Sequence, residues 1–150
     1  MLVRKSLLAL ACAAAVALLA GACGDDDDGG DGGGDGGSTT TLDVVLEEFT
    51  VAPSISSVPA GSVTFSVVNN GTITHDLLVI STNVAPNQLP VDQATFAVDT
   101  DDLDVVAQSE QFGAGESVEV TAELETGSYV LICNVPTHYD EGMYTAFTAQ

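Results

Sequence analysis

The sequence predicts an all-β fold, a β-sandwich of short strands, with a small barrel as the alternative. Apolar and polar residues alternate with a period of two in residues 62–68 and 117–124, as in half-buried strands. Turn-forming triplets follow these runs, first Asn69-Asn70-Gly71 and later Glu125-Thr126-Gly127. The roughly 110 residues beyond the amino-terminal segments suffice for one domain with one core.

Strand-forming residues cover most of this domain. The predicted strands, in chain order, are residues 41–51, 62–68, 75–81, 117–124, 128–133 and 144–149. The apolar run 75–81 suits a strand that is buried on both faces. In residues 128–133 the period of two places Tyr129, Leu131 and Cys133 on one face.

The stretch between residues 82 and 111 is less regular, because Pro86 and Pro90 interrupt it. The sequence predicts a short helix here, at residues 91–97 or at residues 102–107. No internal repeat is present in the sequence.

The amino-terminal residues 1–22 are predicted to be a lipoprotein signal peptide. Arg4 and Lys5 precede an apolar stretch that is short for a membrane span. Leu19-Ala20-Gly21-Ala22-Cys23 resembles a lipobox, although Ala20 stands where Leu is usual. We therefore expect lipidation of Cys23 and export to the outer face of the cell membrane, periplasmic or extracellular. An ordinary cleaved signal or a short membrane anchor is the alternative.

A linker is predicted at residues 23–40, with the folded domain at 41–150. Six aspartates lie among glycines between residues 24 and 37, and none of these side chains can form a core. Such a segment is expected to be a disordered, self-repelling tether. A calcium site in this run is the alternative, but the alternating ligand spacing of a calcium loop is missing.

The chain is strongly acidic, with 22 Asp and Glu, two basic residues and a formal net charge of −20. Both basic residues, Arg4 and Lys5, lie in the predicted signal peptide, so the domain has no Lys or Arg. This charge disfavours nucleic acid and anionic lipid headgroups as partners and favours basic proteins. A solvated acidic coat suited to high external salt is an equally good interpretation.

The scarce metal-binding residue types gather near the carboxyl terminus. After Cys23 the chain contains one further cysteine (Cys133), two histidines (His75 and His138) and one methionine (Met143). Three of these four form a Cys-x₄-His-x₄-Met run. One Cys, two His and a weak axial Met are the ligands of a mononuclear blue-copper site. The sequence therefore predicts one copper ion, with the fourth ligand, His75, following the Asn69-Asn70-Gly71 turn.

Other chemistries fit these residues less well. A Cys–His nucleophile usually needs an orienting third group and gives Met143 no role. Structural zinc prefers further Cys or His ligands to a thioether. A copper enzyme needs a second, His-rich centre, and the sequence has no further histidine. The protein is therefore predicted not to be an enzyme.

The segment from residue 127 to 147, which contains Cys133-Asn-Val-Pro-Thr-His138-Tyr-Asp-Glu-Gly-Met143, resembles the copper loop of cupredoxins. The plastocyanin/azurin-like, sulfocyanin-like and halocyanin-like electron carriers are the most similar members. Asn69-Asn70-Gly71-Thr-Ile-Thr-His75-Asp76 is similar to the stretch that carries the first histidine in that family. The resemblance implies a Greek-key β-sandwich, with His75, Cys133, His138 and Met143 as ligands and His138 at the solvent edge.

The sequence departs from the family pattern at two places. Thr137 stands where Gly is common, and Asp76 stands where Asn is common. In the family, the amide of that Asn bridges the two ligand loops. We expect Asn134 to rebuild the bridge by donating to the Asp76 carboxylate, which would alter the redox potential.

The function predicted from these features is one-electron transfer by a membrane-tethered monomer. A redox partner, such as a basic cytochrome or an oxidase, is expected to dock at an apolar rim formed by Val135, Pro136 and Tyr139. Two alternatives remain open: a module that stores or delivers copper without redox turnover, and an interaction domain with a vestigial site.

Overall fold

The computed structural model describes residues 39–150, so the predicted signal peptide, Cys23 and nearly all of the tether lie outside the described residues. All the regular secondary structure in residues 39–150 is strand, and no helix there could cross a membrane. The strands are β1 (Thr40–Glu47), β2 (Thr50–Pro53), β3 (Ser57–Val58), β4 (Gly61–Asn69), β5 (Leu78–Ser81), β6 (Val91–Asp92), β7 (Ala97–Val98), β8 (Asp104–Gln108), β9 (Ser117–Leu124), β10 (Gly127–Ile132) and β11 (Tyr144–Ala149).

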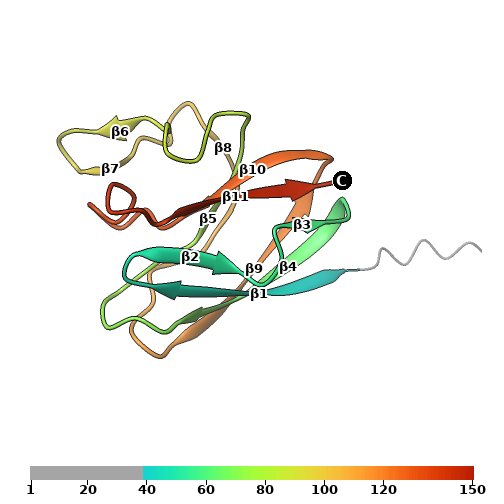
Figure 1. The fold of residues 1–150 in the computed structure, drawn as a ribbon, viewed down its shortest axis with the longest axis horizontal. Helices are drawn as coiled ribbons and strands as arrows, with labels where there is room; N and C mark the ends of the chain where they lie inside the picture. The colour runs from blue at the N-terminus through green and yellow to red at the C-terminus, as the bar shows by residue number, and fades with distance from the viewer. Residues whose placement is uncertain (1–38) are drawn as a thin grey trace, which may run out of the picture. The chain divides into compact units, whose positions relative to one another are not determined.

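The strands form two sheets that face each other, with a separate β6–β7 hairpin beside them (Figure 1). The first sheet has the order β2-β1-β4-β9, and the second has the order β3-β11-β10-β5-β8. The β1–β4 and β3–β11 pairs are parallel, and the other pairs are antiparallel. The predicted β-sandwich is therefore confirmed, and the barrel alternative is wrong.

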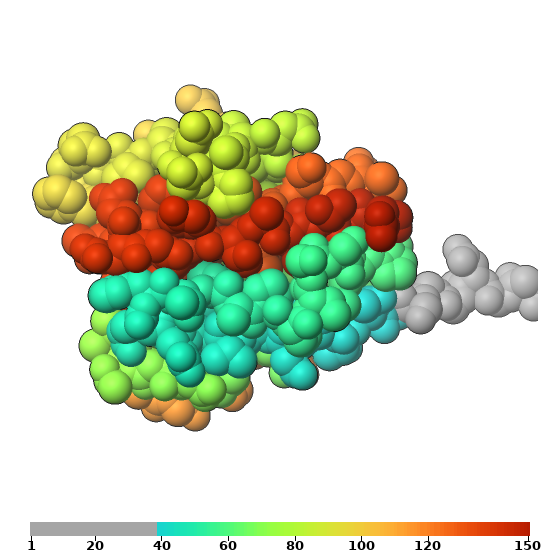
Figure 2. Space-filling model, viewed as in Figure 1, coloured from blue at the N-terminus to red at the C-terminus, as the bar shows by residue number. Residues whose placement is uncertain are grey.

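The second sheet is buried on both of its faces. Leu131 and Val79 belong to the main core between the sheets, whereas Ile132 and Ile80 belong to a smaller cluster on the opposite face. Leu89 and Val98, from the segment that joins β5 to β8, also belong to this smaller cluster. Figure 2 shows the yellow-green atoms of this segment beside the red atoms of the carboxyl-terminal segment. This covering explains why β5 and β10 are apolar at consecutive positions.

Two predictions about local structure are wrong. Neither predicted helix forms, because residues 91–98 contain the short β6–β7 hairpin and residues 104–108 pair with β5 as an edge strand. The β-branched Val105 and Val106 favour this extended backbone. The predicted strand 41–51 is two antiparallel strands, β1 and β2, with Glu48 and Phe49 at the turn between them.

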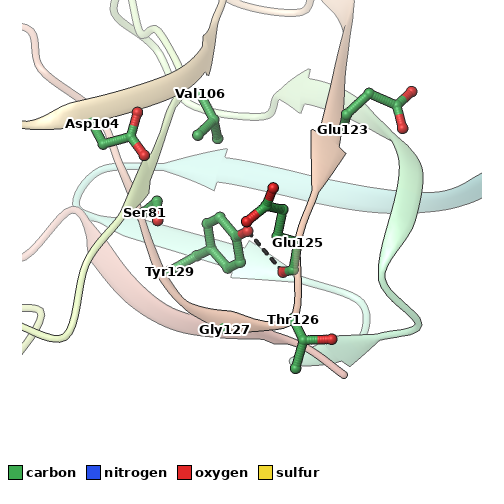
Figure 3. A pocket seen from close by; sticks show the side chains of 8 residues that line it. All are labelled: Ser81, Asp104, Val106, Glu123, Glu125, Thr126, Gly127 and Tyr129. Atoms are coloured by element: carbon green, nitrogen blue, oxygen red, sulfur yellow. Dashed lines mark hydrogen bonds between the residues drawn. The ribbon is translucent and has the colours of Figure 1, made fainter.

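The beginning of β10 lies against an acidic hollow (Figure 3). The hydroxyl of Tyr129 donates a hydrogen bond to the backbone carbonyl of Glu125, at 2.8 Å, across the β9–β10 turn. A tyrosine hydroxyl that bonds to the backbone a few residues upstream is known as a tyrosine corner, and it recurs in Greek-key β-sandwiches. The cavity beside it, of about 310 Å³, includes Asp104 and Glu123 in its lining but no Cys or His. The predicted ligand Cys133 follows the other end of the same strand.

Candidate metal centre

The β10–β11 pairing brings Cys133 opposite Met143. In this antiparallel register Ile132 pairs with Tyr144, so the next residue outward on each strand is Cys133 and Met143. The backbone N–H of Cys133 donates to the carbonyl of Met143 at 3.0 Å, and that of Met143 donates to the carbonyl of His138 at 3.1 Å. The side chains of Cys133 and Met143 are both fully buried. The strand register therefore closes the Cys-x₄-His-x₄-Met run into a compact loop.

His75 is fixed by a different part of the fold. Its backbone N–H and carbonyl both bond to Phe112, at 3.1 and 2.9 Å, in an isolated β-bridge. The preceding loop is braced by the buried Asn69, whose amide donates to the carbonyls of Ile73 and Phe112 and whose oxygen accepts the N–H of Gly71. The predicted Asn-Asn-Gly turn thus also supplies the side chain that holds the loop leading to His75.

Three predicted ligand atoms converge on one point. His75 Nδ1 and His138 Nδ1 are 3.2 Å apart, and Cys133 Sγ lies 3.6 Å from the former and 3.4 Å from the latter. Donor atoms that surround one metal ion in a plane, at the 2.0–2.3 Å typical of zinc–nitrogen and zinc–sulfur bonds, stand roughly 3.5 Å apart. The three side chains are buried, and they are the one group of this kind within residues 39–150. Their arrangement fits a bound metal ion.

In the metal-free site, the side chains of Cys133 and His138 are both neutral near pH 7. Burial, and next the charge of Asp76, raises the pKa of the Cys133 thiol to about 12. Burial, and next the neighbouring His75, lowers the pKa of the His138 imidazole below its ordinary value. Metal binding at Cys133 must therefore displace a thiol proton, whereas His138 offers a neutral ring without prior proton loss.

The predicted link between Asn134 and Asp76 is present, and it uses the backbone. Asn134 N–H donates to Asp76 Oδ1 at 2.6 Å, and Asp76 N–H points to Cys133 Sγ at 3.5 Å. The Asn134 side chain instead holds the β6–β7 hairpin: its oxygen accepts Val98 N–H at 2.7 Å and its amide donates to the Val98 carbonyl at 3.2 Å. Asn134 therefore joins the strand end at Cys133 to two other segments.

The loop between Cys133 and Met143 contains a strained backbone position at Thr137. Thr137, where Gly is common in the resembling family, has a φ of 74°, in the left-handed region that disfavours a β-branched residue. Its N–H donates to the carbonyl of Phe96 at 2.6 Å, and this bond helps to hold the conformation. Gly142 has a φ of 115°, which a side chain would disfavour, and it lets the chain turn into Met143.

Two residues near the site were not predicted from the sequence. The ring of Phe49 lies edge-on to His138, with centroids 5.5 Å apart, and Glu48 Oε1 lies 3.4 Å from His75 Nε2. Both residues fall inside the predicted strand 41–51, and no motif marks them. They lie in the β1–β2 turn, which is distant in sequence from all four predicted ligands.

One rim prediction is wrong. Tyr139 is buried rather than surface-exposed, because its ring packs near Tyr144. Its hydroxyl donates to the carbonyl of Pro86 at 2.6 Å and accepts the N–H of Leu89 at 2.9 Å. Pro136 is exposed and Val135 is partly exposed. His138, which the resemblance placed at the solvent edge, is only 5% exposed.

Comparison with known proteins identifies similar folds and one matching family. The family model described as "Sulfocyanin (SoxE) domain" matches residues 52–150. Reduced auracyanin from Roseiflexus castenholzii is 23% identical and superposes with a TM-score of 0.54, over 76% of this chain and 99% of that one. Auracyanin A from Chloroflexus aurantiacus, described as a "blue" copper protein, is 23% identical with a TM-score of 0.54, over 75% of this chain and 100% of that one. Auracyanin B is 25% identical with a TM-score of 0.56, over 76% and 90%. No curated protein matches the sequence.

Proposed function

Since the chain belongs to the sulfocyanin family, we propose that it is a type 1 copper protein that carries single electrons at the outer face of the cell membrane. The observation that carries this proposal is the convergence of His75 Nδ1, His138 Nδ1 and Cys133 Sγ within 3.6 Å of one another in a buried site. One thiolate and two imidazoles are donors of such centres, so Cys133, His75 and His138 would hold the copper ion, and Met143 would add a weak thioether ligand.

When bound, the copper ion alternates between Cu(II) and Cu(I) and so accepts and releases one electron. The protein's own residues hold the donors in place during this change. Two independent braces support a rigid site: the β-bridge at His75 and the register of β10 with β11 at Cys133 and Met143. A fixed donor set limits rearrangement between the two oxidation states, which favours fast electron exchange.

Electrons leave and enter through the rim around His138. The partly exposed Phe49 ring lies against the imidazole, and Pro136 is exposed in the same loop. We expect the partner to be a basic cytochrome or oxidase, since residues 39–150 carry 16 acidic residues and no Lys or Arg. The carrier is a monomer in this proposal, joined to the membrane by a lipid on Cys23 and the acidic tether.

The visible spectrum of the full-length protein loaded with Cu(II) tests the site. An intense thiolate-to-copper charge-transfer band is expected, and it should disappear in Cys133→Ser. Met143→Leu, a swap of similar volume, should retain the band and copper and shift the reduction potential. A band that survives in Cys133→Ser, or its absence from the wild type, would show that the assignment is wrong.

Electron transfer separates a carrier from a module that stores or delivers copper. The carrier should reduce and reoxidise reversibly with a basic cytochrome, at a rate that falls as ionic strength rises. A storage or delivery module should instead pass the metal to a competing chelator faster than it exchanges electrons. Membrane fractionation tests the anchor: Cys23→Ser should release the protein, and its retention would indicate an uncleaved signal segment.

A further inference from the structure

The loop before His75 is held from the outside by one acidic side chain. Glu48 Oε1 accepts the backbone N–H groups of Thr72 and Ile73, at 2.7 and 2.9 Å. The parallel β1–β4 pairing places Leu46 beside Asn69, so the residues that follow each strand come together here. Gly71 leaves room for the carboxylate, because a Cβ at this position would collide with the Glu48 carboxylate group.

The same carboxylate faces the ring nitrogen of His75 that points away from the predicted metal. His75 is fully buried, and its Nε2 makes no hydrogen bond within the described part of the chain. Glu48 Oε1 lies 3.4 Å from that nitrogen, and the Glu48 side chain is a quarter exposed. Because Nδ1 points toward Cys133 and His138, a metal-bound His75 carries its proton on Nε2.

We propose that Glu48 is a positioning residue for His75: its carboxylate accepts a hydrogen bond from the Nε2–H of the metal-bound imidazole, and its negative charge favours Cu(II) over Cu(I). Histidine ligands of metals commonly donate their second ring N–H to a carboxylate, which fixes the ring and increases its basicity as a ligand. Backbone N–H bonds, first that of Ile73 and then that of Thr72, lower the pKa of Glu48, so the group is ionised at neutral pH. This inference rests on the proposed copper site and adds a residue that controls its reduction potential.

The reduction potential of Glu48→Gln, measured beside that of Glu47→Gln, tests the charge. Glutamine retains an oxygen that can accept the Thr72 and Ile73 N–H groups, so a purely structural role survives this change. Glu47→Gln is the matched control, because it removes the same charge from the exposed neighbouring residue. We expect Glu48→Gln to favour Cu(I) about tenfold, a rise of about 59 mV for a one-electron couple, and Glu47→Gln to cause a much smaller rise. Equal shifts in the two variants would overturn the proposal.

Gly71→Ala provides a second variant that displaces the carboxylate without removing it. Its methyl group must push the Glu48 side chain away from His75. The potential should rise in Gly71→Ala, and the combined change with Glu48→Gln should be less than additive, because both act on one contact. Full additivity would contradict the assignment.

A measurement without redox chemistry separates this inference from the proposed function. In protein loaded with Zn(II), the Nε2–H proton of His75 should resonate further downfield in the wild type than in Glu48→Gln, since a charged acceptor makes a stronger hydrogen bond. Identical resonances would overturn the role of Glu48. A wild type that lacks the charge-transfer band would instead refute the copper carrier and leave this zinc measurement valid.

Discussion

The carboxylate of Asp76 accepts the backbone N–H of Asn134 at 2.6 Å, and this bond joins the two segments that carry His75 and Cys133. Asp76 is 7% exposed, so its carboxylate depends on such donors for solvation. The bond takes the place of the amide bridge that the resembling family makes at this position, and it brings a negative charge next to the thiol.

Removing the Asp76 carboxylate should weaken the link between the segments that carry His75 and Cys133. Asp76→Ala leaves the Asn134 N–H without its partner, so the free energy of unfolding of the metal-free protein should fall by about 1.5–3 kcal/mol. Asp76→Asn keeps an acceptor oxygen and should lose less. Urea unfolding of protein dialysed against a chelator measures both values, and equal losses in the two variants would mean that the hydrogen bond is not the cause.

Thr137 should be replaceable by glycine with a gain in stability. Its φ of 74° costs a β-branched residue about 1–2 kcal/mol, and the greater flexibility of glycine in the unfolded chain offsets about 0.5–1 kcal/mol of the gain. Thr137→Gly should therefore raise the free energy of unfolding by about 0.5–1 kcal/mol. Thr41→Gly is the control: Thr41 is an exposed residue of β1 without positive φ, and this change should lower stability. A lower free energy of unfolding in both variants would show that the backbone at Thr137 is not strained.

The stability of the metal-free protein should fall above pH 9 because of Cys133. The folded state retains the thiol proton up to a pKa of about 12, whereas the unfolded chain loses it near the ordinary value of 9.0. The folded state thus binds more protons in this range, so the free energy of unfolding declines with pH, by at most about 1.4 kcal/mol per unit.

Cys133→Ala provides the comparison for this pH dependence, measured by urea unfolding between pH 8 and pH 11. Burial also raises the pKa values of Tyr129 and Tyr139, so both proteins share a decline from those groups. The difference between the two slopes reports the thiol alone. Parallel curves for wild type and Cys133→Ala would show that Cys133 does not contribute.

Phe49 should control access to His138. The imidazole is 5% exposed and the Phe49 ring lies edge-on to it, so Phe49→Ala should uncover the His138 ring. Copper-loaded Phe49→Ala should exchange electrons severalfold faster with a small cationic ruthenium ammine complex, measured by stopped flow.

Phe96→Ala is the matched control for Phe49→Ala. Phe96 is another exposed phenylalanine, and within residues 39–150 its ring contacts neither histidine ring. Its removal should leave the exchange rate unchanged. An equal acceleration in the two variants would mean that general exposure, rather than the cover over His138, limits the rate.

Much of the fold could be predicted because its strands follow a simple period. The alternation in residues 117–124 and 128–133 corresponds to β9 and β10, and it placed Leu131 and Cys133 on one face, which the structure shows to be the inner face. The segment 82–111 could not be predicted in the same way. Its short strands pair mainly with β5 and with each other, so contacts distant in sequence override the weak local preference.

The sequence by itself determined which side chains are available to a metal, because after Cys23 the chain has one cysteine, two histidines and one methionine. It also marked Thr137 as a departure from the family pattern and indicated the link from Asn134 to Asp76, whereas the positive φ of Thr137 came from the structure. Only the tertiary structure decided what surrounds these residues: Glu48 behind His75, Phe49 against His138 and the Asn134 side chain on Val98. The reason is physical. Donor types are a property of composition, whereas the neighbours of each donor depend on strand register and sheet pairing, which bring together segments far apart in the chain.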